Sequence, residues 1–263
     1  MHHLRRNGPR ERTGREMSLR EEYDEGGVMN ELHLFAGAGG GILGGLLLGH
    51  APVCAVELEA YPRSVLLQRQ RDGILPWFPV WDDVRTFDGN PWKGQVDIIS
   101  GGFPCNGISS IGDRDAFGHP KTGLWKEMVR VIREVRPEYV FVENVQNLLV
   151  LGLGDVLGDL AGMGFDAAWG MYGAHQVQAN HRRERIWVLA HTRRLGRQAC
   201  KETPRGQFEP HRCDWWMGEP GMGRLDDGTP NRMDRLRCLG MLQVPAVAAL
   251  AFTTLHSRLM RAV

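Results

Sequence analysis

The sequence has 263 residues, of which 42% are hydrophobic and 24% are charged, and its formal net charge at pH 7 is +1. This composition is typical of a globular protein with one sizeable α/β domain, and it excludes a wholly disordered chain. The longest apolar run, residues 40–49, is rich in glycine and too short to span a bilayer. Five cysteines without regular spacing argue against a disulfide framework, so we expect a cytoplasmic protein without a membrane segment.

The folded part of the chain is expected to begin with a strand, a glycine turn and a helix. The apolar stretch 32–35 runs into Ala36-Gly37-Ala38-Gly39-Gly40-Gly41, and an apolar helix is predicted to follow through Leu48. Glycines at such a turn let backbone amides approach a ligand at the helix N-terminus. A second strand, 53–57, ends in Glu57, which either binds the hydroxyls of a ribose or simply faces solvent.

Two further predicted strands are followed by side chains that could bind a ligand or take part in catalysis. Residues 79–81 form a third strand that ends in Asp82-Asp83, a pair that either reaches a ligand amino group or caps a turn. The branched apolar run 96–99 leads into Gly101-Gly102-Phe103-Pro104-Cys105. Ligands lie at the carboxyl ends of strands in an open parallel sheet, so Cys105 is a candidate nucleophile, with a buried structural cysteine as the alternative.

A carboxylate follows the next predicted strand. Strand 138–142 is wholly apolar except at its first residue, and it is predicted to end in Glu143-Asn144, with a helix over 147–163 after it. We expect Glu143 to lie at the same sheet edge as Cys105.

Two arginines and an irregular segment complete the chain. A strand over 183–190 places Arg183 and Arg185 on one face, where they need anionic or carbonyl partners unless solvent covers them. Residues 192–231 are rich in Gly, Pro and Arg and predict a small irregular insertion, whose Cys and His spacing matches no standard zinc site, so no metal is expected. A final apolar helix is predicted over 243–262.

Five motifs in order give the chain a family resemblance. It resembles the cytosine-5-specific DNA methyltransferase family, particularly its short bacterial and phage members, over nearly all of residues 31–255. The motifs are Leu34-Phe35-Ala36-Gly37-Ala38-Gly39-Gly40, Gly102-Phe103-Pro104-Cys105, Glu143-Asn144-Val145, Arg183-Glu184-Arg185 and Leu239-Gly240-Met241-Leu242-Gln243-Val244-Pro245.

The resemblance implies a fold class and a domain layout. The fold would be α/β, a Rossmann-like sheet of the S-adenosylmethionine-dependent methyltransferases with a small irregular target-recognition insertion. Residues 1–30 would be a disordered tail of mixed charge, and residues 31–191 a catalytic and cofactor-binding domain. Residues 192–231 would be the short target-recognition region, and residues 232–263 a C-terminal helix that returns to the catalytic domain.

The resemblance also implies a reaction. Carbon 5 of cytosine is not nucleophilic, so the thiolate of Cys105 would first add to carbon 6, and carbon 5 would then attack the methyl group of S-adenosylmethionine. Glu143 would hold the ring nitrogen and the exocyclic amine, Arg185 the carbonyl oxygen, and Arg183 would support a loop or a phosphate. Such a pocket is out of reach inside a duplex, so the target cytosine would be flipped out of double-stranded DNA.

Cofactor and DNA contacts follow from the same resemblance, with no membrane involved and a monomer expected. Phe35 would pack on the adenine, Glu57 bind the ribose and Asp83 the adenine amine. Further cofactor contacts are implied for Gly37, Gly39, Gly40 and Pro104, and DNA contacts for Asn106, Ser109, Arg114, Arg193 and Arg194.

The motifs depart from the family pattern at three positions, and they leave alternatives open. Asn106 stands where Gln is usual, His181 also replaces a Gln, and Met241 replaces an Asn. The departures favour, as one alternative, a catalytically weak or inactive homologue that binds DNA and cofactor. A second alternative is an RNA cytosine-5 methyltransferase, and a third is a nicotinamide dehydrogenase, which would leave Cys105, Glu143 and Arg185 without a shared purpose.

Overall fold

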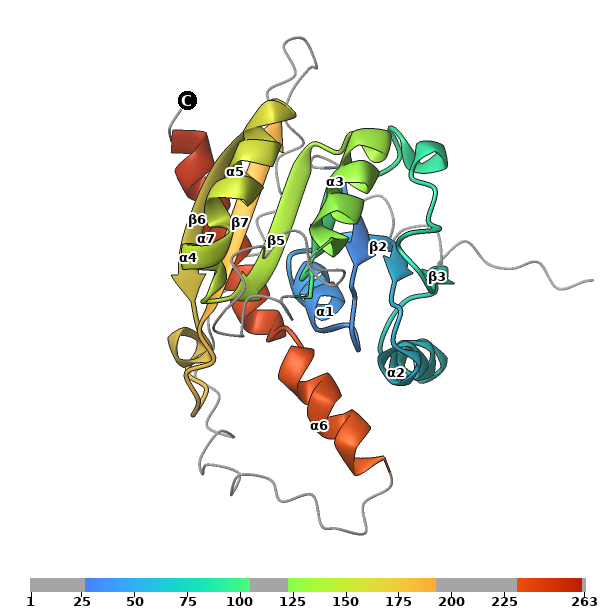
Figure 1. Cartoon of the computed structure of the whole chain (residues 1–263). Helices are drawn as coiled ribbons and strands as arrows, with labels where there is room; N and C mark the ends of the chain where they lie inside the picture. The colour runs from blue at the N-terminus through green and yellow to red at the C-terminus, as the bar shows by residue number, and fades with distance from the viewer. Residues whose placement is uncertain (1–26, 105–122, 193–230, 262–263) are drawn as a thin grey trace, which may run out of the picture.

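The computed structural model describes residues 27–104, 123–192 and 231–261, and the structural statements below concern these residues (Figure 1). Within them, seven strands form one sheet in the order β3-β2-β1-β4-β5-β7-β6. The strands are β1 (Asn30–Leu34), β2 (Ala51–Val56), β3 (Val80–Trp81), β4 (Ile98–Gly101), β5 (Tyr139–Val145), β6 (Phe165–Tyr172) and β7 (Arg185–Thr192). The first five are parallel, and β7 is antiparallel to β5 and β6, so the predicted α/β class is confirmed with a mixed sheet.

Helices cover both faces of the sheet and make three layers (Figure 1). One face carries α3 (Leu124–Val135), α4 (Leu148–Leu151) and α5 (Leu153–Gly162). The other face carries α1 (Gly40–Leu47), α2 (Ala60–Arg71) and α7 (Pro245–Arg261). Helix α6 (Arg232–Met241) extends away from the sheet in Figure 1, and two short 3-10 helices are η1 (Asn90–Trp92) and η2 (Ala174–Val177).

Strand β5 shows why the sequences of the central strands are apolar at nearly every position. Val140 and Val142 point into the core beneath α3 and α5, whereas Tyr139 and Phe141 point into the core beneath α7. All four side chains are buried, because a strand with helices on both faces has no solvent side.

Helix α3 is amphipathic in the way its sequence predicts. Its apolar side chains recur at helical spacing and are buried against the sheet, while its charged side chains lie on the opposite side. The buried residues are Trp125, Met128, Val129, Val131, Ile132 and Val135. The outer face is therefore left with charged side chains that can contact the loops around it.

The predicted helix over 147–163 is wrong as a single element. The structure has two helices, α4 and α5, which meet at Gly152, where φ is −171° and ψ is 0°. Such an extended residue cannot continue a helix, and the apolar sequence on both sides conceals the break. Helix α6 was not predicted separately from the C-terminal helix, because residues 232–241 are polar and lack a clear apolar stripe.

The strand boundaries near the arginines and Glu143 also differ from the prediction. Strand β7 begins at Arg185, and Arg183 precedes it with a φ of 31°, so the two arginines do not share a strand face. The cause is tertiary, since the Arg183 side chain donates hydrogen bonds to the carbonyls of Gly240 and Leu242, which are distant in the sequence. Glu143 lies inside β5 opposite Trp187, rather than after the strand.

The C-terminal segment Arg232–Arg261 is long and apolar enough, by length and composition alone, to cross a membrane. It is divided into α6 and α7, and α7 buries seven residues in the core behind the sheet. A buried core helix passes the same test, so we assign α7 to the core.

Candidate active site

The carboxyl ends of the parallel strands meet along one edge of the sheet. Phe35 follows β1, Glu57 follows β2, Asp83 lies beyond β3, and Gly102 follows β4. The antiparallel strand β7 starts at this edge, because Arg185 is paired with Val145 at the end of β5. The topology thus brings the candidate side chains from distant parts of the sequence to one side of the molecule.

The turn after β1 has an unusual backbone. Phe35, Gly37 and Gly39 all have positive φ, at 54°, 55° and 91°. A bulky residue in this region is strained, and such strain persists where the surrounding structure holds it, often at ligand sites. The turn leads into the N-terminus of α1, where unpaired backbone amides can approach a ligand.

Glu57 is tied to this turn. Its Oε2 accepts a hydrogen bond of 2.7 Å from the Gly37 amide, and its Oε1 accepts one of 2.8 Å from the Glu59 amide. Burial raises the pKa of Glu57, and these two hydrogen bonds oppose that effect. This buried carboxylate beside a glycine turn has acceptor lone pairs left for the hydroxyls of a ribose.

Asp83 lies one strand further along the edge. The Arg85 side chain donates to both of its carboxylate oxygens, with the shortest contact 2.6 Å from Nη2 to Oδ2. These hydrogen bonds lower the pKa of Asp83. Asp83 is therefore an ionised hydrogen-bond acceptor near Glu57, whose amide bonds to the Trp81 carbonyl of β3 at 2.9 Å.

Glu143, the candidate catalytic carboxylate, is buried, with 8% of the residue exposed. Its Oε1 lies 3.2 Å from Arg185 Nε, and its Oε2 lies 3.5 Å from Gln243 Nε2. Burial raises the pKa of Glu143, against the opposing effect of the Arg185 and Arg183 charges. The raised pKa makes it easier for this carboxyl to carry a proton and donate it than for an exposed glutamate.

The segment after β4 lies directly against Glu143. A Cβ atom added to Gly102 would be 2.6 Å from Glu143 Oε2, so glycine alone leaves room for the carboxylate. The Asn144 side-chain amide donates a 3.0 Å hydrogen bond to the Phe103 carbonyl. Pro104 follows and is half-buried, and it is the last described residue before Cys105.

One cleft connects the glycine turn with Glu143. It is lined from β1 and its turn, from the N-terminus of α1, from β4 and from the α6–α7 connection. The lining residues include Phe35, Gly37, Gly41, Gly101, Gly102, Glu143, Met241, Leu242 and Gln243. Two of the candidate cofactor residues, Phe35 and Gly37, therefore line the same cleft as the candidate catalytic carboxylate.

Gln243 was not given a role from the sequence, although it lies within one of the five motifs. It contacts the Glu143 carboxylate, and its backbone packs against Gly40, since a Cβ atom there would be 3.1 Å from the Gln243 carbonyl carbon. Arg183 fixes this connection by donating to the carbonyls of Gly240 at 2.8 Å and of Leu242 at 2.5 Å. The motif over residues 239–245 could have pointed to Gln243. Within that motif, only position 241 was considered from the sequence, where Met replaces the usual Asn.

Several predicted site residues lie outside the described residues. They are Cys105, Asn106, Ser109, Arg114, Arg193 and Arg194, together with residues 1–26 and nearly all of the insertion over 192–231. Their predicted roles stay predictions.

Comparison with known families decides what kind of protein carries this cleft. The model of the C-5 cytosine-specific DNA methylase family matches residues 29–213. The chain belongs to this family. The matched region contains every strand of the sheet, the glycine turn, and the residues Glu57, Glu143 and Arg185.

Members of the C-5 cytosine-specific family with curated names share moderate identity with the chain. The type II methyltransferase M.CviJI of Paramecium bursaria Chlorella virus IL3A is 30% identical over 86% of this chain and 59% of its own length. The type II methyltransferase M.Eco47II of Escherichia coli is 29% identical over 62% of this chain and 39% of its own length. The chain thus spans less than two thirds of the length of these relatives.

Solved structures agree on the fold. The S. pombe Dnmt2 methyltransferase has a TM-score of 0.52 and 20% identity, over 65% of this chain and 53% of that chain. The Entamoeba histolytica methyltransferase EhMeth has a TM-score of 0.51 and 12% identity, over 65% of this chain and 55% of that chain. These neighbours support the assignment of the sheet to the Rossmann-like methyltransferase fold.

Proposed function

We propose that this protein is a DNA cytosine-5 methyltransferase, which transfers a methyl group from S-adenosylmethionine to carbon 5 of a flipped-out cytosine in double-stranded DNA. Membership of the family supports the reaction class, and the names of the type II relatives support DNA as the substrate. The observation that carries the proposal is the buried Glu143–Arg185 ion pair packed against Gly102, three residues before Cys105.

Glu143 and Arg185 suit the two polar edges of cytosine. A protonated Glu143 would donate to ring nitrogen 3, and Arg185 would donate to the carbonyl oxygen at carbon 2. Burial raises the pKa of Glu143, which makes its protonated form easier to reach than that of an exposed glutamate. Hydrogen bonds to the cytosine would then replace part of the contact between Glu143 and Arg185. Both side chains would therefore have hydrogen-bond partners with and without DNA.

The chemistry would run through Cys105. Its thiolate adds to carbon 6, and the electron pair of the 5,6 double bond becomes available at carbon 5 while Glu143 protonates nitrogen 3. Carbon 5 forms the new bond to the methyl group, whose donor leaves as S-adenosylhomocysteine. Loss of the carbon-5 proton to a base then expels the thiolate, Glu143 recovers its proton from nitrogen 3, and methylated cytosine is released.

The residues present fit S-adenosylmethionine, which supplies the methyl group when it is bound. The Gly37 amide in the strained turn holds the Glu57 carboxylate at 2.7 Å, and a Cβ atom at Gly37 would meet nothing within 4 Å, so the turn leaves room for a ligand beside Glu57. Glu57 has carboxylate acceptors for the ribose, and Asp83 is an ionised acceptor for the adenine amine. Pro104 would complete this site beside the methyl group, as an expectation from the motif.

The test is transfer of labelled methyl groups to unmethylated duplex DNA by wild type and by the variants Cys105→Ala and Glu143→Gln. We expect wild type to label cytosine in DNA, Cys105→Ala to be inactive, and Glu143→Gln to be slower by roughly 100-fold or more. Asp155→Asn, at an exposed position on α5, is the matched control and should keep wild-type activity. Absence of label in any DNA, or label only in transfer RNA added in parallel, would contradict the proposal.

A further inference from the structure

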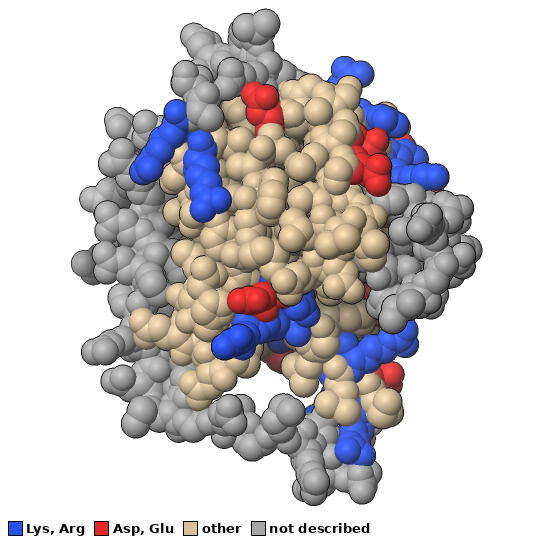
Figure 2. All heavy atoms as spheres, turned by 60° about the vertical axis from the view of Figure 1, so that its left-hand side comes forward, with Lys and Arg blue, Asp and Glu red and all other residues tan. Residues whose placement is uncertain are grey.

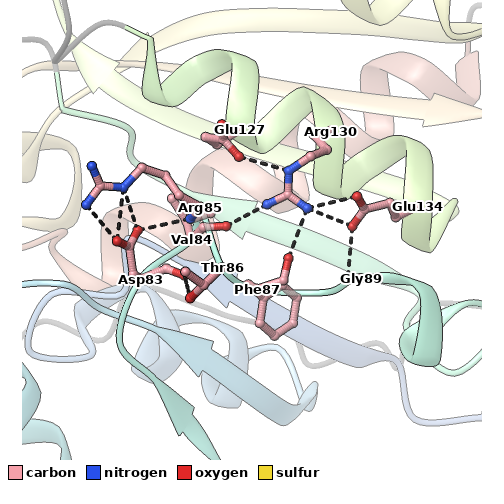
Figure 3. Close-up of polar contacts among 9 residues, drawn as sticks. All are labelled: Asp83, Val84, Arg85, Thr86, Phe87, Gly89, Glu127, Arg130 and Glu134. Carbon is pink, nitrogen blue, oxygen red and sulfur yellow. Dashed lines mark hydrogen bonds and ion pairs between the residues drawn. The ribbon is translucent and has the colours of Figure 1, made fainter.

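An arginine on the outer face of α3 holds a loop that begins at the cofactor edge of the sheet. Figure 3 shows the Arg130 guanidinium between α3 and the chain that follows β3. Its Nη2 donates a 2.6 Å hydrogen bond to the Val84 carbonyl, and its Nη1 donates a 2.9 Å hydrogen bond to the Phe87 carbonyl. These bonds join residues more than 40 positions apart in the sequence.

Two carboxylates fix the direction of the guanidinium. Glu134 accepts from Nη1 at 2.8 and 2.9 Å, and Glu127 accepts from Nε at 2.8 Å (Figure 3). Glu134 also accepts the Gly89 amide at 2.8 Å, so it closes the far end of the same loop. Two side chains of its own helix therefore orient Arg130, and its guanidinium also donates hydrogen bonds to the backbone of the loop.

The loop depends on these contacts for its conformation. Residues 82–89 contain no helix or strand; the Asp83 and Val84 carbonyls accept turn hydrogen bonds from the Thr86 and Phe87 amides, and Arg130 adds one hydrogen bond to Val84 and one to Phe87. The side chains of Val84 and Phe87 are buried at 4% exposure each, and they anchor the loop to the core. The Arg130 hydrogen bonds fix the backbone between these anchors.

Asp83 immediately precedes the first carbonyl that Arg130 holds. The strand before it, β3, is hydrogen-bonded to β2, and Glu57 at the end of β2 donates its amide to the Trp81 carbonyl. A nucleoside whose ribose is bound by Glu57 would extend its base toward the next strand end, which is the Asp83 segment. The position of the Asp83 carboxylate then decides how well it accepts the adenine amine.

We propose that Arg130 is a positioning residue for cofactor binding: it holds the backbone of residues 84–87 so that Asp83, which precedes them, faces the adenine edge. The inference rests on the proposed function, since it takes the ligand at this edge to be the adenosine of S-adenosylmethionine. Lysine cannot replace Arg130, because one ammonium cannot reach two carbonyls and two carboxylates in the fixed fork that a guanidinium provides.

The test compares two ligands that differ only at the base. S-adenosylhomocysteine carries the 6-amino group, whereas S-inosylhomocysteine carries a carbonyl there, which Asp83 would repel. Calorimetric titration of wild type should favour the adenine ligand by about tenfold or more. Arg130→Lys should lose about tenfold in affinity for the adenine ligand and little for the inosine ligand, so the preference collapses.

Arg133→Lys is the matched control, because it makes the same change at an exposed position of the same helix α3. It should keep the wild-type preference. If Arg130→Lys keeps the wild-type preference, or loses both ligands by the same factor, the inference is overturned while the proposed function stands. A wild-type protein that binds neither ligand would overturn both.

A second variant covers the case in which Arg130→Lys does not fold, as judged by circular dichroism. Glu134→Gln weakens the hold on Arg130 and on the Gly89 amide while it keeps the guanidinium. It should reduce the preference for the adenine ligand in the same direction, and an unchanged preference would overturn the inference.

Discussion

Glu143 sits between two opposing electrostatic effects. Its burial favours the neutral carboxyl, whereas Arg185 at 3.2 Å favours the carboxylate. Burial is the larger effect, so the pKa of Glu143 is raised. Burial thus eases protonation of Glu143 and makes its ionised form costly to stability.

This cost predicts a pH dependence of stability. Because the folded pKa is raised above its ordinary value of 4.5, the stabilising effect of the proton on Glu143 is fully present below pH 4.5 and is lost as the pH rises through the folded pKa. Glu143→Gln cannot titrate, so it should gain in stability relative to wild type as the pH rises from 4.5 into the neutral range. Urea unfolding of both proteins across that range measures the difference.

A stability difference between the two proteins that stays constant with pH, or that shifts in favour of wild type as the pH rises, would show that Glu143 is an ordinary ionised partner of Arg185. An exposed control, Asp155→Asn, should show no comparable trend.

At the scale of residues, the sequence predicts which residues form the site better than it predicts the contacts that they make. Glu143 and Arg185 meet as their motifs imply, because β5 and β7 are neighbours. The role of Arg183 in holding the α6–α7 connection could not be predicted, since its positive φ and its two carbonyl partners depend on a segment 57 and 59 residues away. Gln243 was missed for the same reason.

At the scale of elements, the glycine turn and the α6–α7 connection form one packed unit. Gly40 at the start of α1 faces the backbone of Gln243, and Gly41 faces the Gln243 side chain. Helix α1 can therefore approach α7 closely only while both positions lack a Cβ atom. This contact aligns the cofactor turn with the residue that touches Glu143.

Adding a methyl group at this contact should separate the two elements. Gly40→Ala places a Cβ atom against the Gln243 backbone, which cannot move aside as a flexible side chain would, so we expect a loss of about 1–3 kcal/mol in unfolding free energy. Gly158→Ala on α5 is the control, because a Cβ atom there meets nothing within 4 Å, and it should be stabilising by roughly 0.5–1 kcal/mol. Chemical denaturation measures both, and equal effects at the two positions would contradict the packing described.

The strands and most helices could be predicted from periodicity, but two kinds of boundary could not. The break between α4 and α5 depends on a single extended glycine, Gly152, in an apolar stretch that reads as one helix. The start of β7 depends on tertiary hydrogen bonds of Arg183 rather than on local pattern. The helix and strand propensities of the local sequence predict neither the break between α4 and α5 nor the start of β7.

At the scale of the molecule, the described surface gives DNA no broad basic field in the view of Figure 2. In this view the centre of the described surface is largely uncharged, and Lys and Arg side chains lie toward its margins, several of them beside acidic ones. This agrees with a net charge of +1 for the whole chain. Phosphate contacts on this account would come mainly from Arg114, Arg193 and Arg194, which lie outside the described residues.

The chain is also short beside its curated relatives, of which it spans 59% and 39% in the two cases compared. The segment 192–231, expected to recognise the target, leaves little surface for base contacts. We therefore expect a short or permissive target sequence.

Bisulfite sequencing of DNA from cells that express the protein tests the central claim most directly, because it reports the modified base and its sequence context together. With wild type, we predict cytosines that resist conversion within one short sequence context, and with Cys105→Ala we predict complete conversion. Complete conversion with wild type, or the same resistant cytosines with Cys105→Ala, would contradict the account.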